Sequence, residues 1–150
     1  MSPIKLKELE KRFHEIPDKP GIYWYEIDQP IKKALFKEDN PAGHYRGKDP
    51  TVRVVCLQEK WVSEATIVYI GETKNLRKRI RLRARFANGE PVRAWGGRYL
   101  WQLDDAIQKR MAVRCKVDQD YKTAESLEIS EFKNKYGKLP FANLVTPKND

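Results

Sequence analysis

The chain has 150 residues, a length at which one domain can bury a core of its own. Apolar residues make up 40% of the sequence and aromatic residues 11%, which excludes an intrinsically disordered chain. Lysine and arginine outnumber aspartate and glutamate by 30 to 21, so the formal charge is +9 and a polyanion is a natural partner.

Three kinds of protein fit this sequence poorly. The first residues are charged throughout and the longest apolar run, near residues 65–70, is too short to span a bilayer, so we expect a cytoplasmic protein with no membrane partner. Cys56 and Cys115 lack the spacing of a disulfide scaffold and are predicted to be reduced. His14 and His44 are too far apart in sequence for a zinc motif, so a bound metal should be a hard ion held by oxygen.

The first predicted element is a helix. Ser2 is a suitable N-cap and Pro3 a suitable first helical residue, and the helix should end before Pro17. A rigid turn at residues 17–20 then leads into a strand over residues 21–27, which is rich in aromatic and β-branched side chains.

Beyond this strand the sequence alternates between loops and short elements. Prolines and glycines indicate an irregular loop over residues 28–50. Two apolar runs, at residues 52–57 and 65–70, predict further strands, and Gly71 is expected to end the second. The later predicted elements are a helix from N-cap Asn75 to about residue 86, a turn-rich segment at 87–97, strands at 99–103 and 111–117, and a helix at 123–136 that ends at Gly137.

This order of elements predicts an α/β (α+β) fold, with a small and mainly antiparallel sheet flanked by helices. Because no repeat or linker divides the chain, we expect one domain over residues 1–150. Residues 28–64 would then be an insertion between two of its strands.

The most specific signal is a pair of tripeptides on two predicted strands, Gly21-Ile22-Tyr23 and Tyr69-Ile70-Gly71, followed by a helix that contains Arg79. The pair resembles the signature of the GIY-YIG nuclease family, over about residues 17–86 and again from the last helix to Asn143. The resemblance implies a metal-dependent endonuclease that uses Mg²⁺ or Mn²⁺ to hydrolyse phosphodiester bonds in DNA, with RNA left open as a substrate.

The resemblance also implies a set of site residues. Tyr23, Tyr69, Arg79 and a late glutamate would gather around one metal ion and one scissile phosphate. The glutamate would hold the metal, Arg79 would neutralise the phosphate, and either tyrosine would accept a proton from the attacking water. Supporting roles fall to Gly71, Asn75 and Asn143.

Helical periodicity favours Glu125 as the metal ligand. At about 100° per residue, Glu125 shares an apolar stripe with Phe132, whereas Glu128 lies at the edge of the stripe and Glu131 points away. Counting back from Pro140 favours Glu131 instead, so Glu128 and Glu131 stay open as alternatives.

Basic side chains supply the expected nucleic-acid contacts. On the helix after Asn75, Arg79 and Arg83 share the inward face at i and i+4, where a guanidinium group needs an anionic partner such as phosphate. Trp95 and Trp101 can stack on an exposed base, although core packing is the stronger expectation. The residues predicted to bind nucleic acid are Lys74, Arg77, Arg79, Arg83 and Arg98.

Three features depart from the family pattern. The tripeptides are normally close in sequence, but here an insertion separates them; its loop, with Lys32, Lys33, Lys37, His44, Arg46 and Lys48, is expected to grip DNA. Arg83 stands where many members have His or Tyr, and Glu72 where some have Lys, a role that Lys74 can take. These departures leave an alternative function, a catalytically inactive GIY-YIG-like module that binds nucleic acid. Target specificity would come from residues 28–50, residues 87–97, a partner protein or self-association.

Overall fold

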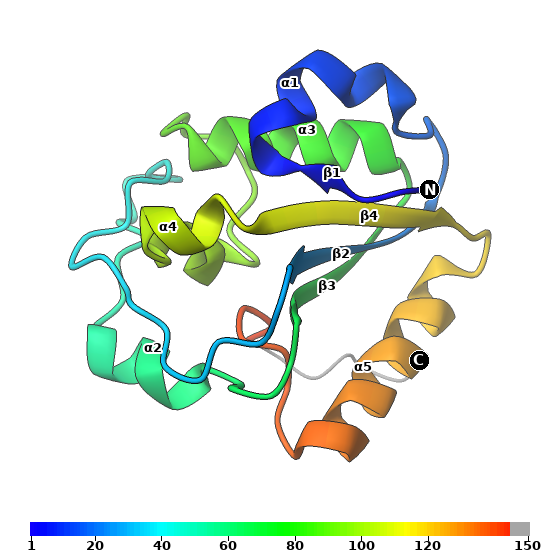
Figure 1. The fold of residues 1–150 in the computed structure, drawn as a ribbon. Helices are drawn as coiled ribbons and strands as arrows, with labels where there is room; N and C mark the ends of the chain where they lie inside the picture. The colour runs from blue at the N-terminus through cyan, green and yellow to red at the C-terminus, as the bar shows by residue number, and fades with distance from the viewer. Residues whose placement is uncertain (145–150) are drawn as a thin grey trace.

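The computed structural model describes residues 1–144, which form a four-stranded antiparallel sheet with five α-helices around it (Figure 1). The strand order is β1-β4-β2-β3, and every neighbouring pair is antiparallel, so the predicted antiparallel α+β architecture is confirmed. The strands are β1 (Ile4–Lys5), β2 (Gly21–Ile27), β3 (Ile67–Thr73) and β4 (Met111–Val117). The helices are α1 (Leu9–Arg12), α2 (Val54–Lys60), α3 (Leu76–Ala87), α4 (Asp105–Gln108) and α5 (Tyr121–Tyr136), with 3₁₀ turns at Leu6–Glu8, Phe13–Glu15 and Arg98–Gln102.

The two signature strands are direct neighbours. Across β2 and β3, Tyr23 pairs with Gly71 and Tyr25 pairs with Tyr69. The insertion leaves the end of β2, extends beyond the sheet and returns to the start of β3 (Figure 1). The insertion therefore does not disturb the pairing of the two tripeptides.

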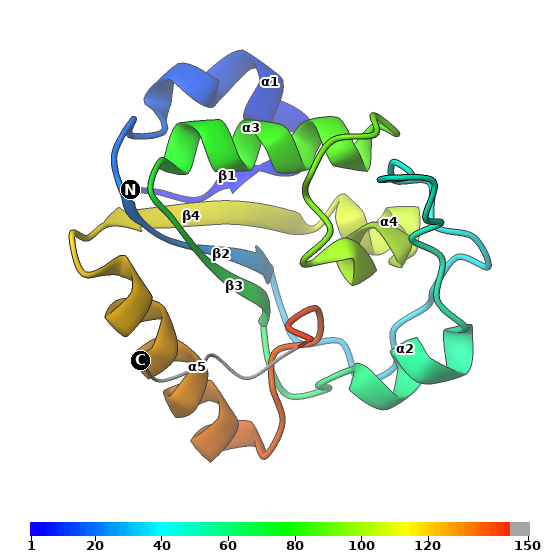
Figure 2. The same cartoon turned by 180° about the vertical axis from the view of Figure 1, so that it is seen from behind.

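Alternation along these strands divides the core between the two faces of the sheet. On one face Tyr23 and Tyr69 belong to the cluster that contains Ile80 of α3. On the other face Trp24 packs with Ile129 of α5 in a separate cluster. Helices α3 and α5 consequently lie on opposite sides of the sheet, as Figures 1 and 2 both show.

The predicted N-terminal helix is partly correct: residues 6–15 are helical but form short 3₁₀ and α segments, and residues 4–5 form a strand. Ile4 is buried and pairs with Val113, so the chain begins as an edge strand, and α1 spans only four residues between 3₁₀ turns. The free energy gained when residues 4–5 pair with β4 outweighs the helix-start preference of Ser2-Pro3, which is purely local.

Two predicted strands are helical. Residues 54–57 of the predicted strand 52–57 belong to α2, which buries Leu57 and leaves Val55 46% exposed; within residues 1–144 no strand pairs with this segment to favour extended backbone. The segment Tyr99–Leu103 is mainly a 3₁₀ turn that follows Gly97, which has a left-handed φ of 78°. That turn buries three successive residues, Leu100, Trp101 and Gln102, which an alternating strand does not do.

The other elements match expectation more closely. Strands β2 and β4 have the predicted bounds, but β3 continues through Gly71 to Thr73. Asn75 caps α3 by accepting a 3.0 Å bond from the Lys78 amide, and α5 ends at Gly137 with a left-handed φ of 77°. Both cysteines are free thiols, as predicted. Among residues 1–144 no helix has the length and apolar character needed to cross a bilayer.

Candidate active site

The centre of the site is a buried arginine that joins the two signature tyrosines. Arg83 donates from Nε to the Tyr23 hydroxyl at 2.6 Å and from Nη2 to the Tyr69 hydroxyl at 2.7 Å. Its guanidinium carbon also lies 4.7 Å from the centre of the Tyr69 ring. The structure thus brings the two predicted tyrosines together, and the arginine that reaches both is Arg83, not Arg79.

The partners of Arg83 are all uncharged. Besides the two phenols, Nη1 donates to the backbone carbonyl of Gly96. Arg83 is only 4% exposed, and within residues 1–144 it forms no ion pair with a carboxylate. Since a buried guanidinium group is expensive without an anion, this arrangement favours a negatively charged ligand nearby.

Two glycines allow the cluster to form. A Cβ on Gly71 would lie 2.3 Å from Cζ of Tyr23, so only glycine lets that ring lie across β3. A Cβ on Gly97 would lie 3.1 Å from Nη1 of Arg83 and 3.2 Å from the Tyr69 ring. Gly71 belongs to the second tripeptide and was expected to support the site. Gly96 and Gly97 had no predicted role, and the only sequence feature that could have pointed to them is that two glycines stand next to each other.

Glu125 approaches the same place from the other side of the sheet. It lines a depression of about 170 Å³ together with Tyr69, Gly96, Gly97 and Asn143. Burial and, to a smaller extent, the nearby Glu72 carboxylate raise the pKa of Glu125 to about 7, and Arg83 partly opposes the shift. A carboxylate and a tyrosine hydroxyl from opposite faces of the sheet therefore meet at the outer edge of β3.

Of the three candidate glutamates, Glu125 and Glu131 lie on different sides of α5. Ile129 and Phe132 pack against the sheet, and Glu125 is half-buried on the same side of the helix. Glu131 is exposed, and Glu128, although half-buried, does not line the depression. Of the three alternatives, only Glu125 lines the depression that contains Tyr69.

Arg79 lies one helical turn before Arg83, in a different environment. It is half-buried and lines a surface cavity of about 450 Å³ with Glu72 and Tyr121. Within residues 1–144 its side chain makes no hydrogen bond or ion pair. The cavity is basic, because its lining also includes Lys74, Lys78 and Lys122.

The two cavities are neighbours along α5. Tyr121 lines the basic cavity and Glu125, one turn later, lines the smaller depression. Glu72 lines the basic cavity and also acts electrostatically on Glu125. A chain of phosphate groups lying along this edge of the sheet would contact the basic side chains at one end and Glu125 and Tyr69 at the other.

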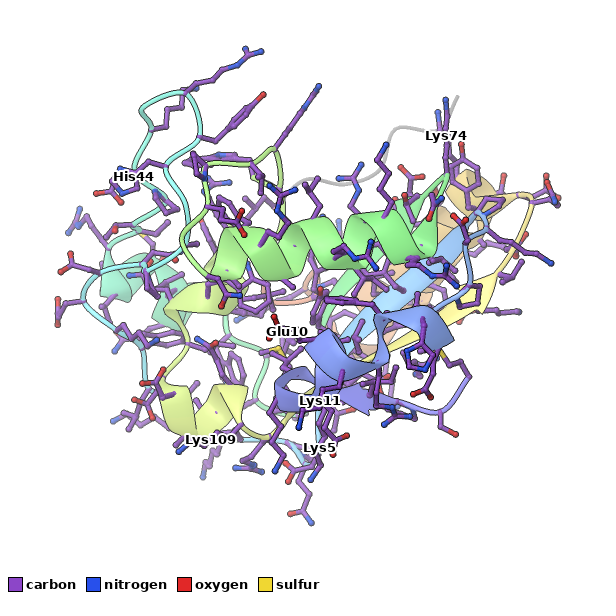
Figure 3. The ribbon with its side chains drawn as sticks, turned by 90° about the horizontal axis from the view of Figure 1, so that it is seen from above. Lys5, Glu10, Lys11, His44, Lys74 and Lys109 are labelled. Atoms are coloured by element: carbon purple, nitrogen blue, oxygen red, sulfur yellow. The ribbon has the colours of Figure 1, made fainter. Side chains whose placement is uncertain are left out.

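The remaining predicted nucleic-acid residues have different surroundings. Lys74 is exposed at the start of α3 (Figure 3). Arg77 instead donates to the backbone carbonyls of Ile16 at 2.8 Å and His14 at 3.1 Å, so it holds the N-terminal segment against α3. Arg98 stacks 4.7 Å over the Trp95 ring, and burial lowers its pKa.

Asn143 supports the site through the backbone. Its side-chain oxygen accepts from the Ile70 amide and its side-chain nitrogen donates to the Ile70 carbonyl, both at 2.9 Å. Ala142 also donates to Val68 at 2.9 Å. These bonds fix the segment after α5 along β3, next to Tyr69.

The donors present fit a hard divalent ion that keeps most of its water. Glu125, with Glu72 as its carboxylate neighbour, offers oxygen ligands, and Mg²⁺ is often bound through one or two carboxylates with water and phosphate oxygens. Within residues 1–144 no group of three or more His, Cys, Asp or Glu side chains is placed to hold a metal ion.

Comparison with protein-family models, with curated proteins and with solved structures found no match to this chain.

Proposed function

We propose that this chain is a GIY-YIG-type endonuclease that hydrolyses phosphodiester bonds in DNA with the help of Mg²⁺ or Mn²⁺. The observation that carries the proposal is the meeting of Tyr69, Arg83 and Glu125 at one edge of β3. These side chains come from a strand and from two helices on opposite faces of the sheet. Their convergence, beside a basic cavity, supplies the groups that phosphodiester hydrolysis requires.

Glu125 is the proposed metal ligand, with Glu72 beside it. A bound divalent ion supplies Lewis acidity toward the phosphate and lowers the pKa of a coordinated water. Glu125 must lose its proton to bind a cation, and its raised pKa of about 7 makes this step dependent on pH in the neutral range.

Tyr69 is the tyrosine proposed to touch the substrate. It lines the depression that contains Glu125, whereas Tyr23 is fully buried behind Gly71. Burial raises the pKa of Tyr69, an effect that Arg83 only partly offsets. We therefore assign the Tyr69 hydroxyl to orienting the attacking water by a hydrogen bond, and Tyr23 to positioning Arg83.

The two inward arginines take separate tasks in this proposal. Arg79 and the lysines around it bind the phosphates that flank the scissile bond, because they line an open basic cavity. Arg83 holds the Tyr69 hydroxyl in place and adds positive charge behind the scissile phosphate.

Plasmid nicking tests the proposal. Supercoiled DNA is incubated with Mg²⁺, Mn²⁺ or EDTA, and Glu125→Gln is compared with Glu131→Gln, the same change at an exposed position of the same helix. We expect metal-dependent nicking that falls about 100-fold or more in Glu125→Gln and in Tyr69→Phe. The matched controls, Glu131→Gln for Glu125→Gln and Tyr99→Phe for Tyr69→Phe, should nick DNA at the wild-type rate. Equal nicking by Glu125→Gln and the wild type would refute the assignment.

A second candidate function is a nucleic-acid-binding module without catalysis. It is favoured by the contacts of Arg83, whose Nε, Nη1 and Nη2 donors already bind two phenols and the Gly96 carbonyl and so are not free to bind a phosphate. The same experiment separates the two functions. Salt-dependent DNA binding without nicking in any metal would support the module.

A further inference from the structure

A tight turn at the tip of the insertion presents two cations to solvent beside a half-buried aromatic ring. The Lys48 amide donates to the Tyr45 carbonyl at 3.1 Å, and Arg46 and Gly47 between them have φ values of 53° and 74°. Two successive left-handed residues make this a type I′ turn. Arg46 and Lys48 are both exposed, and the guanidinium carbon of Arg46 lies 5.3 Å from the centre of the Tyr45 ring.

The turn is held in place by the segments that build the site. Gly43, just before it, donates to the carbonyl of Phe86 at the end of α3 at 2.9 Å. A Cβ on Gly43 would lie 1.9 Å from the carbonyl oxygen of Glu90, so the two backbones are in direct contact. Asn40 donates at 2.8 Å to the carbonyl of Arg98, next to the Gly96–Gly97 pair. The turn is therefore held in a fixed position relative to Arg83 and to the Gly96–Gly97 pair that contacts it.

The turn projects on the same side of the molecule as the basic cavity. Figure 3 shows His44, at its base, and Lys74, at the rim of the cavity, on one side of the molecule near opposite ends of α3. Lys5, Lys11 and Lys109 lie on the opposite side (Figure 3). The rim of the basic cavity and the base of the turn thus lie on the same side of the molecule.

The cations of the turn have no carboxylate partner in the described part of the chain. Neither Arg46 nor Lys48 forms an ion pair there, although the adjacent His44 lies 3.7 Å from Asp49. Two exposed cations, one of them beside an aromatic ring, match the chemistry of a sugar–phosphate backbone, since phosphates attract the cations and an aromatic ring can pack on sugar or base.

We propose that the Tyr45–Lys48 turn is a second nucleic-acid contact, which binds the phosphate backbone of a DNA duplex at a distance from the Tyr69–Glu125 site. This contact rests on the proposed function in one respect, namely that the scissile phosphate lies at the Tyr69–Glu125 site. With this contact the insertion lengthens the bound stretch of duplex and fixes its direction across the β3 edge.

Binding measured without cutting tests the turn. Fluorescence anisotropy in EDTA with labelled DNA duplexes of increasing length gives Kd for the wild type, Arg46→Ala/Lys48→Ala and Lys5→Ala/Lys11→Ala. The last variant removes the same charge from the opposite side. We expect the turn variant to weaken binding about tenfold and to reduce the slope of log K against log salt by about 2, because each phosphate contact contributes about 0.9.

The control and the duplex length decide the outcome. The Lys5/Lys11 variant should bind as the wild type does, and the loss in the turn variant should vanish on duplexes too short to reach from the site to the turn. Equal weakening in both variants, or an unchanged Kd in the turn variant, would overturn the proposal. A thermal melt of each variant checks that the fold is retained.

The test separates this proposal from the proposed function. If no form of the protein nicks DNA but the turn variant loses affinity, the contact stands and the nuclease assignment fails. If nicking depends on Glu125 and the turn variant binds normally, the nuclease assignment stands and the contact fails.

Discussion

Arg83 on α3 donates a 2.7 Å hydrogen bond to the hydroxyl of Tyr69 on β3, and both side chains are more than nine-tenths buried. This bond fixes the register of a highly basic helix against the strand that carries the second tripeptide. Among residues 1–144 the buried cation is held by neutral groups, and this arrangement keeps positive charge beside a surface depression.

Replacing Arg83 with lysine should destabilise the protein by about 1–3 kcal/mol, because one ammonium group cannot span two phenols and the Gly96 carbonyl. Urea unfolding measures the change. Arg81→Lys is the matched control on the same helix; Arg81 is exposed, so its substitution should alter stability by less than about 0.5 kcal/mol. Similar losses in both variants would show that the Arg83 cluster adds nothing specific.

Gly71→Ala should destabilise the fold by about 1–3 kcal/mol through overpacking, since its Cβ would lie 2.3 Å from the Tyr23 ring. Combining it with Tyr23→Leu, which shortens the opposing side chain, tests the mechanism. The double variant should be more stable than the sum of the single effects predicts. Strict additivity of the unfolding free energies would contradict a clash between these two residues.

Gly97→Ala should cost more than Gly137→Ala. Both glycines have nearly the same left-handed φ, 78° and 77°, so alanine costs about 1 kcal/mol in backbone strain at either position. Only at Gly97 does the added Cβ also meet Arg83 and Tyr69; at Gly137 it meets open space. Thermal unfolding of the two variants should give the lower Tm for Gly97→Ala. Equal Tm values would rule out a packing role for Gly97.

Glu125→Gln should stabilise the protein at pH 8 more than at pH 5. The folded-state pKa of about 7 exceeds the value of about 4.3 for an unperturbed glutamate, so the folded state holds this proton more tightly than the unfolded state does. The stability from this group is present below about pH 4.3 and is lost as pH rises toward 7. The Tm difference between variant and wild type should therefore grow over this range and then level off. Glu131→Gln, at an exposed position, should show no such trend. A Tm difference for Glu125→Gln that is independent of pH would contradict the shift.

Divalent ions should offset the free energy of unfolding that is lost when Glu125 becomes charged in the folded protein. Millimolar Mg²⁺ or Mn²⁺ should raise the Tm of the wild type more at pH 8 than at pH 6, because the metal binds the deprotonated carboxylate. The increase should disappear in Glu125→Gln and persist in Glu131→Gln. The same Tm increase in Glu125→Gln would place the metal elsewhere.

Local patterns in the sequence determined the parts of this protein that depend on near neighbours. The aromatic and β-branched content of residues 21–27 predicted β2, the alternation of residues 111–117 predicted β4, and Asn75 and Gly137 marked helix ends. Helical periodicity also predicted that Glu125 faces the sheet, because the angle between residues of one helix does not depend on the rest of the fold.

Tertiary structure alone decided what depends on distant partners. Residues 54–60 contain a β-branched run, but no strand in the described part of the chain pairs with them, and they form α2. Periodicity turned Arg79 and Arg83 toward the same face, yet only Arg83 reaches both tyrosines. The angle around a helix is a local property. The position of α3 along β2 and β3 is set by packing between segments far apart in sequence, and that position selects which arginine meets the hydroxyls.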